Sequence, residues 1–327
     1  MWDELDATDR RLLDDWQRDL PITPRPFAGL GRALGLTEAA VLRRLFRLRQ
    51  AGAIARVGGT TRPNTAGAST LAAVAAPEQA LDRVAAGIGA TPGVNHCYLR
   101  ENRWNIWFVA TGPDRGHVDA ALAGISRRTG LRVLDLRLVR AFNVDLGFAL
   151  DGTRPLPAPR RADPRAIRPG DAAILQALST GLALVPRPFA ALARAAGREE
   201  TAVLTRIRAL SEAGIIGRLG VIVRHRALGW TSNAMVVWDV PPGAIDAAGP
   251  RLAVQPGVTL CYQRRPAGRA WPYTLYAMFH ARSRLAALES MVRAAEAAGI
   301  AAAPSEILFS LRCFRQSGAS ITAGAAA

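Results

Sequence analysis

The sequence PGVNHCYLRE at residues 92–101 returns as PGVTLCYQRR at residues 256–265. Both copies keep the pattern Cys-Tyr-x-Arg, but His96 of the first copy becomes Leu260 in the second. Other blocks recur in the same order, so the chain is a tandem duplication of two units of roughly 150 residues each. A duplication that becomes unequal at a histidine predicts an asymmetric site.

Each unit begins with a predicted winged helix-turn-helix. In the first, RPFA at residues 25–28 opens the second helix, Gly35 marks a turn, and a basic helix begins at Thr37. Residues 54–59 then predict a strand and wing. The second unit repeats RPFA at residues 187–190 with fewer cations on its third helix. The basic side chains of the first third helix are Arg43, Arg44, Arg47 and Arg49.

The second part of each unit predicts a ferredoxin-like fold, with the order strand, helix, strand, strand, helix, strand. The fold class is therefore α+β, a duplicated helix-turn-helix domain and ferredoxin-like domain. The expected elements of the first unit are residues 70–76, 78–88, 94–100, 104–110, 118–127 and 131–138. Those of the second are residues 232–240, 244–254, 258–264, 271–280, 285–297 and 305–312.

Proline and alanine-rich stretches set the domain boundaries. A Pro/Arg-rich segment predicts a stiff linker between the units, and an Ala/Gly/Ser-rich end predicts a flexible tail. The predicted parts are a helix-turn-helix domain at 1–66, a ferredoxin-like domain at 67–150, the linker at 151–168, the second helix-turn-helix domain at 169–228, the second ferredoxin-like domain at 229–317 and the tail at 318–327.

Composition excludes several classes of protein. The net charge is +16, and all 42 basic residues are arginine, so a Schiff-base lysine and a phosphate-loop lysine are both absent. Arginine binds carboxylates and phosphates through two parallel hydrogen bonds. The three cysteines form no CxxC pair, and because the sequence shows neither a charged-then-apolar N-terminus nor an apolar run of about 20 residues, we expect no signal peptide and no membrane span. We therefore expect a cytoplasmic protein with no disulfide, zinc site or membrane contact.

The motifs resemble a known family. Helix-turn-helix plus ferredoxin-like domain is the layout of the Lrp/AsnC regulators, and five motifs are similar to those of the siroheme decarboxylases of the fused NirDL type. Cys97 and Thr274 depart from the family, which usually has Asn at both positions. The motifs are RPFA at 25–28, HCYLRE at 96–101, NIWFV at 105–109, NAMVVWDV at 233–240 and WPYTLYAMFH at 271–280.

The resemblance implies a reaction and its partners. Siroheme would lose two acetate carboxyl groups, giving 12,18-didecarboxysiroheme and two CO2 in haem d1 biosynthesis. No added cofactor is expected, because the iron belongs to the substrate and the macrocycle accepts the electron pair. The expected assembly is a homodimer or a complex with related decarboxylase subunits.

Strand alternation predicts the site. His96, Tyr98 and Arg100 fall on one face of a strand, with His96 as the proton donor because imidazole titrates near neutral pH. The second copy offers Leu260, Tyr262 and Arg264 instead, so we expect a full catalytic site in only one of the two pockets. His280 is a second candidate proton donor, and either histidine is a candidate axial ligand of the substrate iron. The remaining predicted substrate contacts are Arg265, His225, Trp271 and Tyr273.

Two other functions stay open on the sequence alone. A DNA-binding regulator would use the basic third helix against phosphates, an alternative that we rank lower because the two helices are unequal. A haem-binding sensor would ligate iron through His96 or His280 without turnover.

Overall fold

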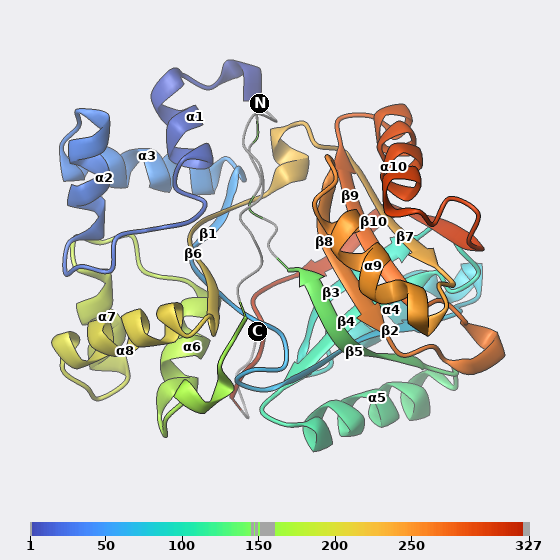
Figure 1. Cartoon of the computed structure of the whole chain (residues 1–327). Coiled ribbons are helices and arrows are strands. Elements are labelled where there is room, and N and C mark those ends of the chain that lie inside the picture. Colours follow the sequence, from blue (N-terminus) through green and yellow to red (C-terminus); the bar gives the residue numbers. More distant parts are fainter. Residues whose placement is uncertain (1, 145–146, 148–149, 151–160, 323–327) are drawn as a thin grey trace. The chain divides into compact units, whose positions relative to one another are not determined.

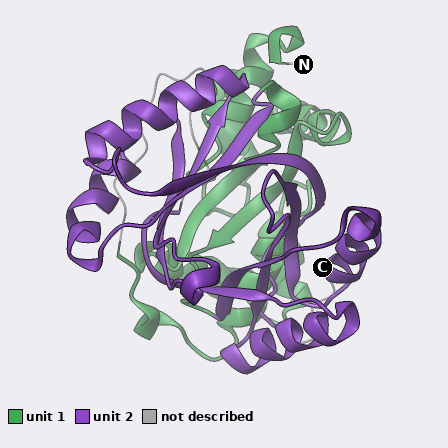
Figure 2. Cartoon of the chain, turned by 90° about the vertical axis from the view of Figure 1, so that its right-hand side faces the viewer, with its two compact units in different colours: residues 1–66, 147–229 green, residues 67–146, 230–327 purple. Residues whose placement is uncertain are grey.

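The computed structural model describes residues 2–144, 147, 150 and 161–322 and divides the chain into two compact units (Figure 1). Unit 1 comprises residues 1–66 and 147–229, and unit 2 comprises residues 67–146 and 230–327, as coloured in Figure 2. Each unit therefore collects the equivalent domains of both repeats. Most of the predicted linker, residues 151–160, lies outside the described residues.

Unit 1 contains the two helix-turn-helix domains. The first helix is capped by Asp6, whose carboxylate accepts from the Asp9 amide at 2.7 Å. Pro26 and Pro188 occupy the first turns of equivalent helices, where no backbone donor is needed. The elements are η1 (Trp2–Glu4), α1 (Ala7–Asp14), α2 (Pro26–Leu34), α3 (Glu38–Gln50), β1 (Ile54–Thr61), η3 (Pro164–Ala166), α6 (Asp171–Thr180), α7 (Pro188–Ala195), α8 (Glu200–Glu212), β6 (Ile216–Val223) and η4 (His225–Leu228).

The two wing strands of unit 1 pair with each other. Strands β1 and β6 are antiparallel, and Gly58 lies opposite Gly220, its counterpart in the other repeat. A Cβ atom on Gly58 would lie 2.4 Å from the carbonyl oxygen of Leu178, and one on Gly220 would lie 2.4 Å from that of Trp16. Both glycines are therefore required by the close approach of backbone from the opposite repeat, helix α6 at Gly58 and the turn after α1 at Gly220.

Unit 2 contains two βαββαβ repeats, which confirms the predicted fold class. The first repeat contains β2 (Ala68–Val74), η2 (Glu78–Ala80), α4 (Leu81–Gly89), β3 (Val94–Arg100), β4 (Ile106–Gly112), α5 (Arg115–Thr129) and β5 (Leu134–Asn143). The second contains β7 (Ser232–Trp238), α9 (Pro242–Ala253), β8 (Val258–Arg264), η5 (Gly268–Ala270), β9 (Leu275–Ala281), α10 (Arg284–Ala298) and β10 (Ser305–Gln316).

The eight strands close into one barrel, in the order β10-β3-β4-β2-β5-β8-β9-β7. Strand β10 pairs with β7 from Ser305 to Phe309 and then with β3 from Ser310 onwards, and β5 bridges β2 and β8 in the same way. The predicted last strands, which ended at residues 138 and 312, were therefore too short. The second half of each strand pairs with a strand of the other repeat. This half contains arginines and lacks a clear alternation of buried and exposed side chains.

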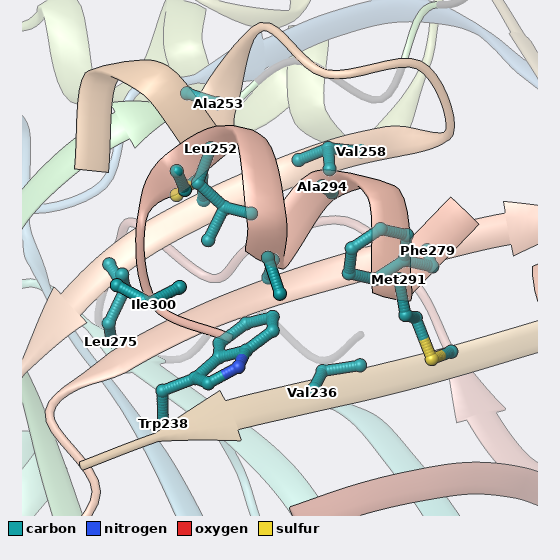
Figure 3. Close-up of a cluster of buried hydrophobic side chains, with 14 of the residues drawn as sticks. Val236, Trp238, Leu252, Ala253, Val258, Leu275, Phe279, Met291, Ala294 and Ile300 are labelled. Carbon is teal, nitrogen blue, oxygen red and sulfur yellow. The ribbon is translucent and has the colours of Figure 1, made fainter. Parts of the chain in front are cut away.

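Each sheet face has its own core. One face of β9, carrying Leu275, Ala277 and Phe279, packs under α9 and α10 (Figure 3), and the first repeat has an equivalent cluster under α4 and α5. The opposite face carries Tyr276 and Met278 into a third cluster shared by both repeats. Residues facing away from the helices therefore meet residues of the other repeat.

The segment predicted to be a flexible tail is packed in its first part. Ser320 and Ile321 are each 5% exposed, and the Ser320 amide donates to Thr111 Oγ1 at 2.9 Å. Among the described residues, no helix has both the length and the apolar character needed to cross a membrane.

Candidate functional site

Strand β3 brings His96, Tyr98 and Arg100 together, as strand alternation predicts. The ring centroids of His96 and Tyr98 are 6.3 Å apart with the rings nearly parallel, and the Arg100 guanidinium carbon lies 5.6 Å from the Tyr98 ring centroid. Cys97, between them, points to the helix-covered core. Burial raises the pKa of the Tyr98 hydroxyl far above its ordinary value, so Tyr98 remains a neutral hydrogen-bond donor.

Arg100 is a buried cation without an acidic partner. It is 6% exposed, and its Nη1 donates to the carbonyl of Leu308 at 3.0 Å and to Asn233 Oδ1 at 3.5 Å. No carboxylate pairs with it within the described ranges of the chain. Burial lowers the pKa of Arg100 to about 10, so the guanidinium still carries its charge at neutral pH. A buried, uncompensated charge is costly and is suited to an anionic ligand.

His280 joins this site from strand β9. Its Nε2 lies 2.5 Å from Asn233 Nδ2, and its Nδ1 lies 2.9 Å from Thr259 Oγ1. Burial, followed by the charge of Arg100, lowers the pKa of His280 to about 4. The structure therefore places His280 with Arg100, but as a neutral imidazole with both nitrogens engaged.

Three residues of this site were not predicted individually. Asn233, Ser310 and Thr259 link Arg100 and His280, and the Ser310 hydroxyl donates to Asn233 Oδ1 at 2.8 Å. One signal was available, because Asn233 is a polar residue near the start of the otherwise apolar run of β7.

Strand β8 presents the second copy of the motif. The Arg264 guanidinium carbon lies 5.0 Å from the ring centroid of Tyr262 and 5.9 Å from that of Tyr276, and Nη1 donates to the carbonyl of Leu136 at 2.8 Å. Arg264 is half-buried and, in the part of the chain that the structure describes, forms no salt bridge, although the charge of Asp135 still acts on it. Leu260 replaces the histidine, so this strand offers a cation but no imidazole.

The last residue of the repeated motif differs in charge, since it is Glu101 in the first copy and Arg265 in the second. Both side chains lie outside the groups of contacts around Arg100 and Arg264. Glu101 forms two hydrogen bonds with Arg284, at 2.7 and 2.5 Å, which lower the pKa of its carboxyl group. Arg265 is exposed. The contacts of the structure therefore do not bring Arg265 together with Arg264, and its predicted contact with the substrate stays a prediction.

The predicted aromatic contacts differ in burial. Trp271 is 2% exposed, donates to the Tyr276 hydroxyl at 2.7 Å and packs 5.1 Å from Trp107, so it occupies a core position and its predicted substrate contact is not supported. Tyr273 is half-buried and donates to Glu306 at 3.2 Å. Burial and this carboxylate raise the pKa of Tyr273 to about 12.

His225 lies in unit 1, in the short helix η4. His225 is therefore not part of the group of contacts that Arg100 and His280 form within unit 2.

The two residues that depart from the family pattern both make contacts within the fold. Cys97 is fully buried against α4 and α5, and burial raises its pKa to about 12. Thr274 exchanges hydrogen bonds with the backbone of Val240, at 2.8 and 3.1 Å. Neither side chain takes part in the contacts around Arg100.

The basic third helix of unit 1 is partly neutralised within its own domain. Arg44 donates to Asp6 at 2.6 Å and to Asp9 at 2.8 Å, and Arg47 also pairs with Asp9. The second domain repeats the arrangement, with Arg206 on Asp171 at 2.6 Å. Because these arginines tie the third helix to the first, they contribute less charge for DNA phosphates than the sequence suggests.

Family profiles match most of the chain. The AsnC-like ligand binding domain matches residues 66–143 and 227–315, and the siroheme decarboxylase NirDL-like HTH domain matches residues 9–54 and 171–216. The chain is 57% identical over 323 residues to the siroheme decarboxylase NirDL subunit of Paracoccus denitrificans (strain Pd 1222), covering 98% of this chain and 99% of that protein.

Partial and structural relatives agree. The siroheme decarboxylase NirD subunit of Pseudomonas aeruginosa is 48% identical over 150 residues, which cover 46% of this chain and 100% of that protein. A crystal structure of the siroheme decarboxylase NirDL superposes with a TM-score of 0.67 at 26% identity, over 95% of this chain and 93% of that one. Its co-complex with an iron-uroporphyrin III analogue gives 0.68 at 25% identity, over 96% and 94%.

Proposed function

The chain belongs to the family of fused siroheme decarboxylase NirDL subunits, so it is a carboxy-lyase. We propose that it removes two acetate carboxyl groups from siroheme. The product is then 12,18-didecarboxysiroheme, an intermediate of haem d1 biosynthesis. A related NirDL structure contains an iron-uroporphyrin III analogue, which supports a polycarboxylate tetrapyrrole as the ligand of this chain too.

One observation carries the proposal. Arg100 and Arg264 occupy equivalent positions of the two repeats, and among the residues described neither forms a salt bridge with a carboxylate. Each already holds part of its guanidinium in place through a backbone carbonyl, Leu308 for one and Leu136 for the other. A ligand with several carboxylates supplies the missing counter-charge.

The reaction balances with one proton for each CO2. The bond between the acetate methylene and its carboxylate breaks, CO2 leaves, and the electron pair moves onto the methylene carbon, which is conjugated to the macrocycle. That carbon then takes up one proton and becomes a methyl group. The macrocycle serves as the electron sink, so the proposal needs no added organic cofactor.

His96 is the proposed proton donor. It is half-buried on the same face of β3 as Arg100, with Tyr98 between them, so a tetrapyrrole held through one carboxylate by Arg100 would extend along this face toward the imidazole. His280 is less suited to ligating iron or donating a proton, because either role at a ring nitrogen would break its bond to Asn233 or Thr259.

An anaerobic incubation with siroheme tests the proposal, with the tetrapyrrole products separated and weighed by mass spectrometry. Loss of the mass of two CO2 supports it. Unchanged siroheme with an altered spectrum contradicts turnover and supports a binding role only. Recovery of a product that has lost one CO2 contradicts the double reaction.

A further inference from the structure

Asn233 connects the two functional groups that come from different repeats. It is on β7, Arg100 is on β3 and His280 is on β9. Its Oδ1 accepts from Arg100 Nη1 at 3.5 Å and from Ser310 Oγ at 2.8 Å, while its Nδ2 meets His280 Nε2 at 2.5 Å. All the polar atoms of one amide are therefore used.

The charge of Arg100 fixes the orientation of this amide. A guanidinium only donates hydrogen bonds, so the oxygen of Asn233 must face it and the NH2 group must face His280. His280 Nε2 must then be the unprotonated acceptor. The proton of a neutral ring consequently lies on Nδ1, which donates to Thr259 Oγ1 at 2.9 Å, and that hydroxyl in turn donates to the carbonyl of Met278 at 3.1 Å.

We infer that Asn233 is a positioning residue for the decarboxylation: it holds His280 in the neutral Nδ1–H tautomer and orients Arg100 toward a substrate carboxylate. The role in Arg100 orientation rests on the proposed function, whereas the tautomer does not. Because the His280 imidazole is neutral, it adds neither a positive nor a negative charge beside Arg100. The charge of the Arg100 guanidinium therefore stays available for a substrate carboxylate.

The first repeat supplies a matched control. Ser69 occupies the position equivalent to Asn233, since Ser69 lies opposite Thr111 on β4 as Asn233 lies opposite His280 on β9. The substitution Ser69→Ala therefore alters the same place in the other repeat without touching Arg100 or His280.

The test uses the full chain with 15N-labelled histidine, and a His280→Gln spectrum identifies the His280 signals. In the wild type, the ring-nitrogen shifts at neutral pH should report Nδ1–H. Asn233→Asp removes the amide donor that faces His280 Nε2 and adds a carboxylate beside Arg100, so the ring should become Nε2–H or doubly protonated. That carboxylate also occupies Arg100, and the KM for siroheme should rise roughly tenfold or more. Ser69→Ala should leave both readouts unchanged.

The outcomes separate the two ideas. An Nε2–H tautomer in the wild type, or an unaltered tautomer in Asn233→Asp, overturns the inferred lock. An unaltered KM in Asn233→Asp overturns the role in orienting Arg100. Absence of decarboxylation by the wild-type protein would instead contradict the proposed function while leaving the tautomer measurement valid.

Discussion

Strands β3 and β8 are copies of one sequence that now differ in chemistry. Both place an arginine over a tyrosine ring and anchor it on a carbonyl of the strand beside it, Leu308 in one case and Leu136 in the other. Only β3 adds an imidazole, and only Arg100 meets a second histidine through Asn233. The arginine and tyrosine that the two strands share suit the proposed carboxylate binding, and the strands differ in the imidazole that we propose as the proton donor.

The largest expected effect separates the two strands at the histidine. His96→Ala should lower kcat for siroheme decarboxylation by on the order of 10²–10⁴-fold, because general acid catalysis contributes about that much. Leu260→Ala should lower kcat less than tenfold, since an apolar side chain has no proton to give. Single-turnover assays with mass detection of the product check both. A native rate in His96→Ala would remove His96 from the mechanism.

The second prediction compares the arginines. Arg100→Met should raise the KM for siroheme by about 10–100-fold, which corresponds to the loss of one hydrogen-bonded charge pair. Arg264→Met should also raise the KM, but by less, because Arg264 is less buried than Arg100. Arg100→Met should cost little thermal stability, since relief of a buried charge offsets the lost hydrogen bonds. Steady-state kinetics and melting curves test this. An unchanged KM in both variants contradicts carboxylate binding.

The third prediction concerns pH. In the folded chain the pKa of His280 is about 4, below its ordinary value of 6.5. Between these two pH values the unfolded chain therefore binds a proton at this histidine that the folded chain does not bind. Stability from this group is therefore complete above about pH 6.5 and is lost as the pH falls toward 4. His280→Gln should flatten this part of the melting-temperature profile, and Arg100→Met should flatten it partly. Profiles of identical slope in wild type and His280→Gln would be inconsistent with a buried neutral imidazole.

The smallest effect is expected at the charge reversal that ends the motifs. Glu101→Gln breaks a partly exposed pair with Arg284, so it should cost at most about 1 kcal/mol in urea unfolding. The siroheme decarboxylation rate should stay within a factor of two or so of the wild type, on the order of a few tenths of a kcal/mol. A large loss of activity would show that Glu101 belongs to the site after all.

Much of the fold was predictable because duplication repeats its own pattern. The bounds of β3 and β8 match the prediction, and the common face of His96, Tyr98 and Arg100 follows from alternation alone. The long strands β5 and β10 were not predictable, because their second halves pair with the other repeat and lose the alternation of a strand with one buried face. The burial of Trp271 was not predictable for a related reason: an aromatic residue near a motif can face either a ligand or a core that both repeats build.

Four features could be read directly from spacing and residue type, because each is encoded locally: the duplication, the order of elements, the arginine-only cations and the histidine asymmetry. The crossing of β10 from β7 to β3 became visible only in the folded chain. This crossing brings Arg100, Asn233 and His280 from three strands into one hydrogen-bonded group. Likewise, only the folded chain shows that Arg44 and Arg47 are held by Asp9. Such pairings depend on which backbone partner a strand or helix finds, and that choice is made by packing between segments far apart in the chain.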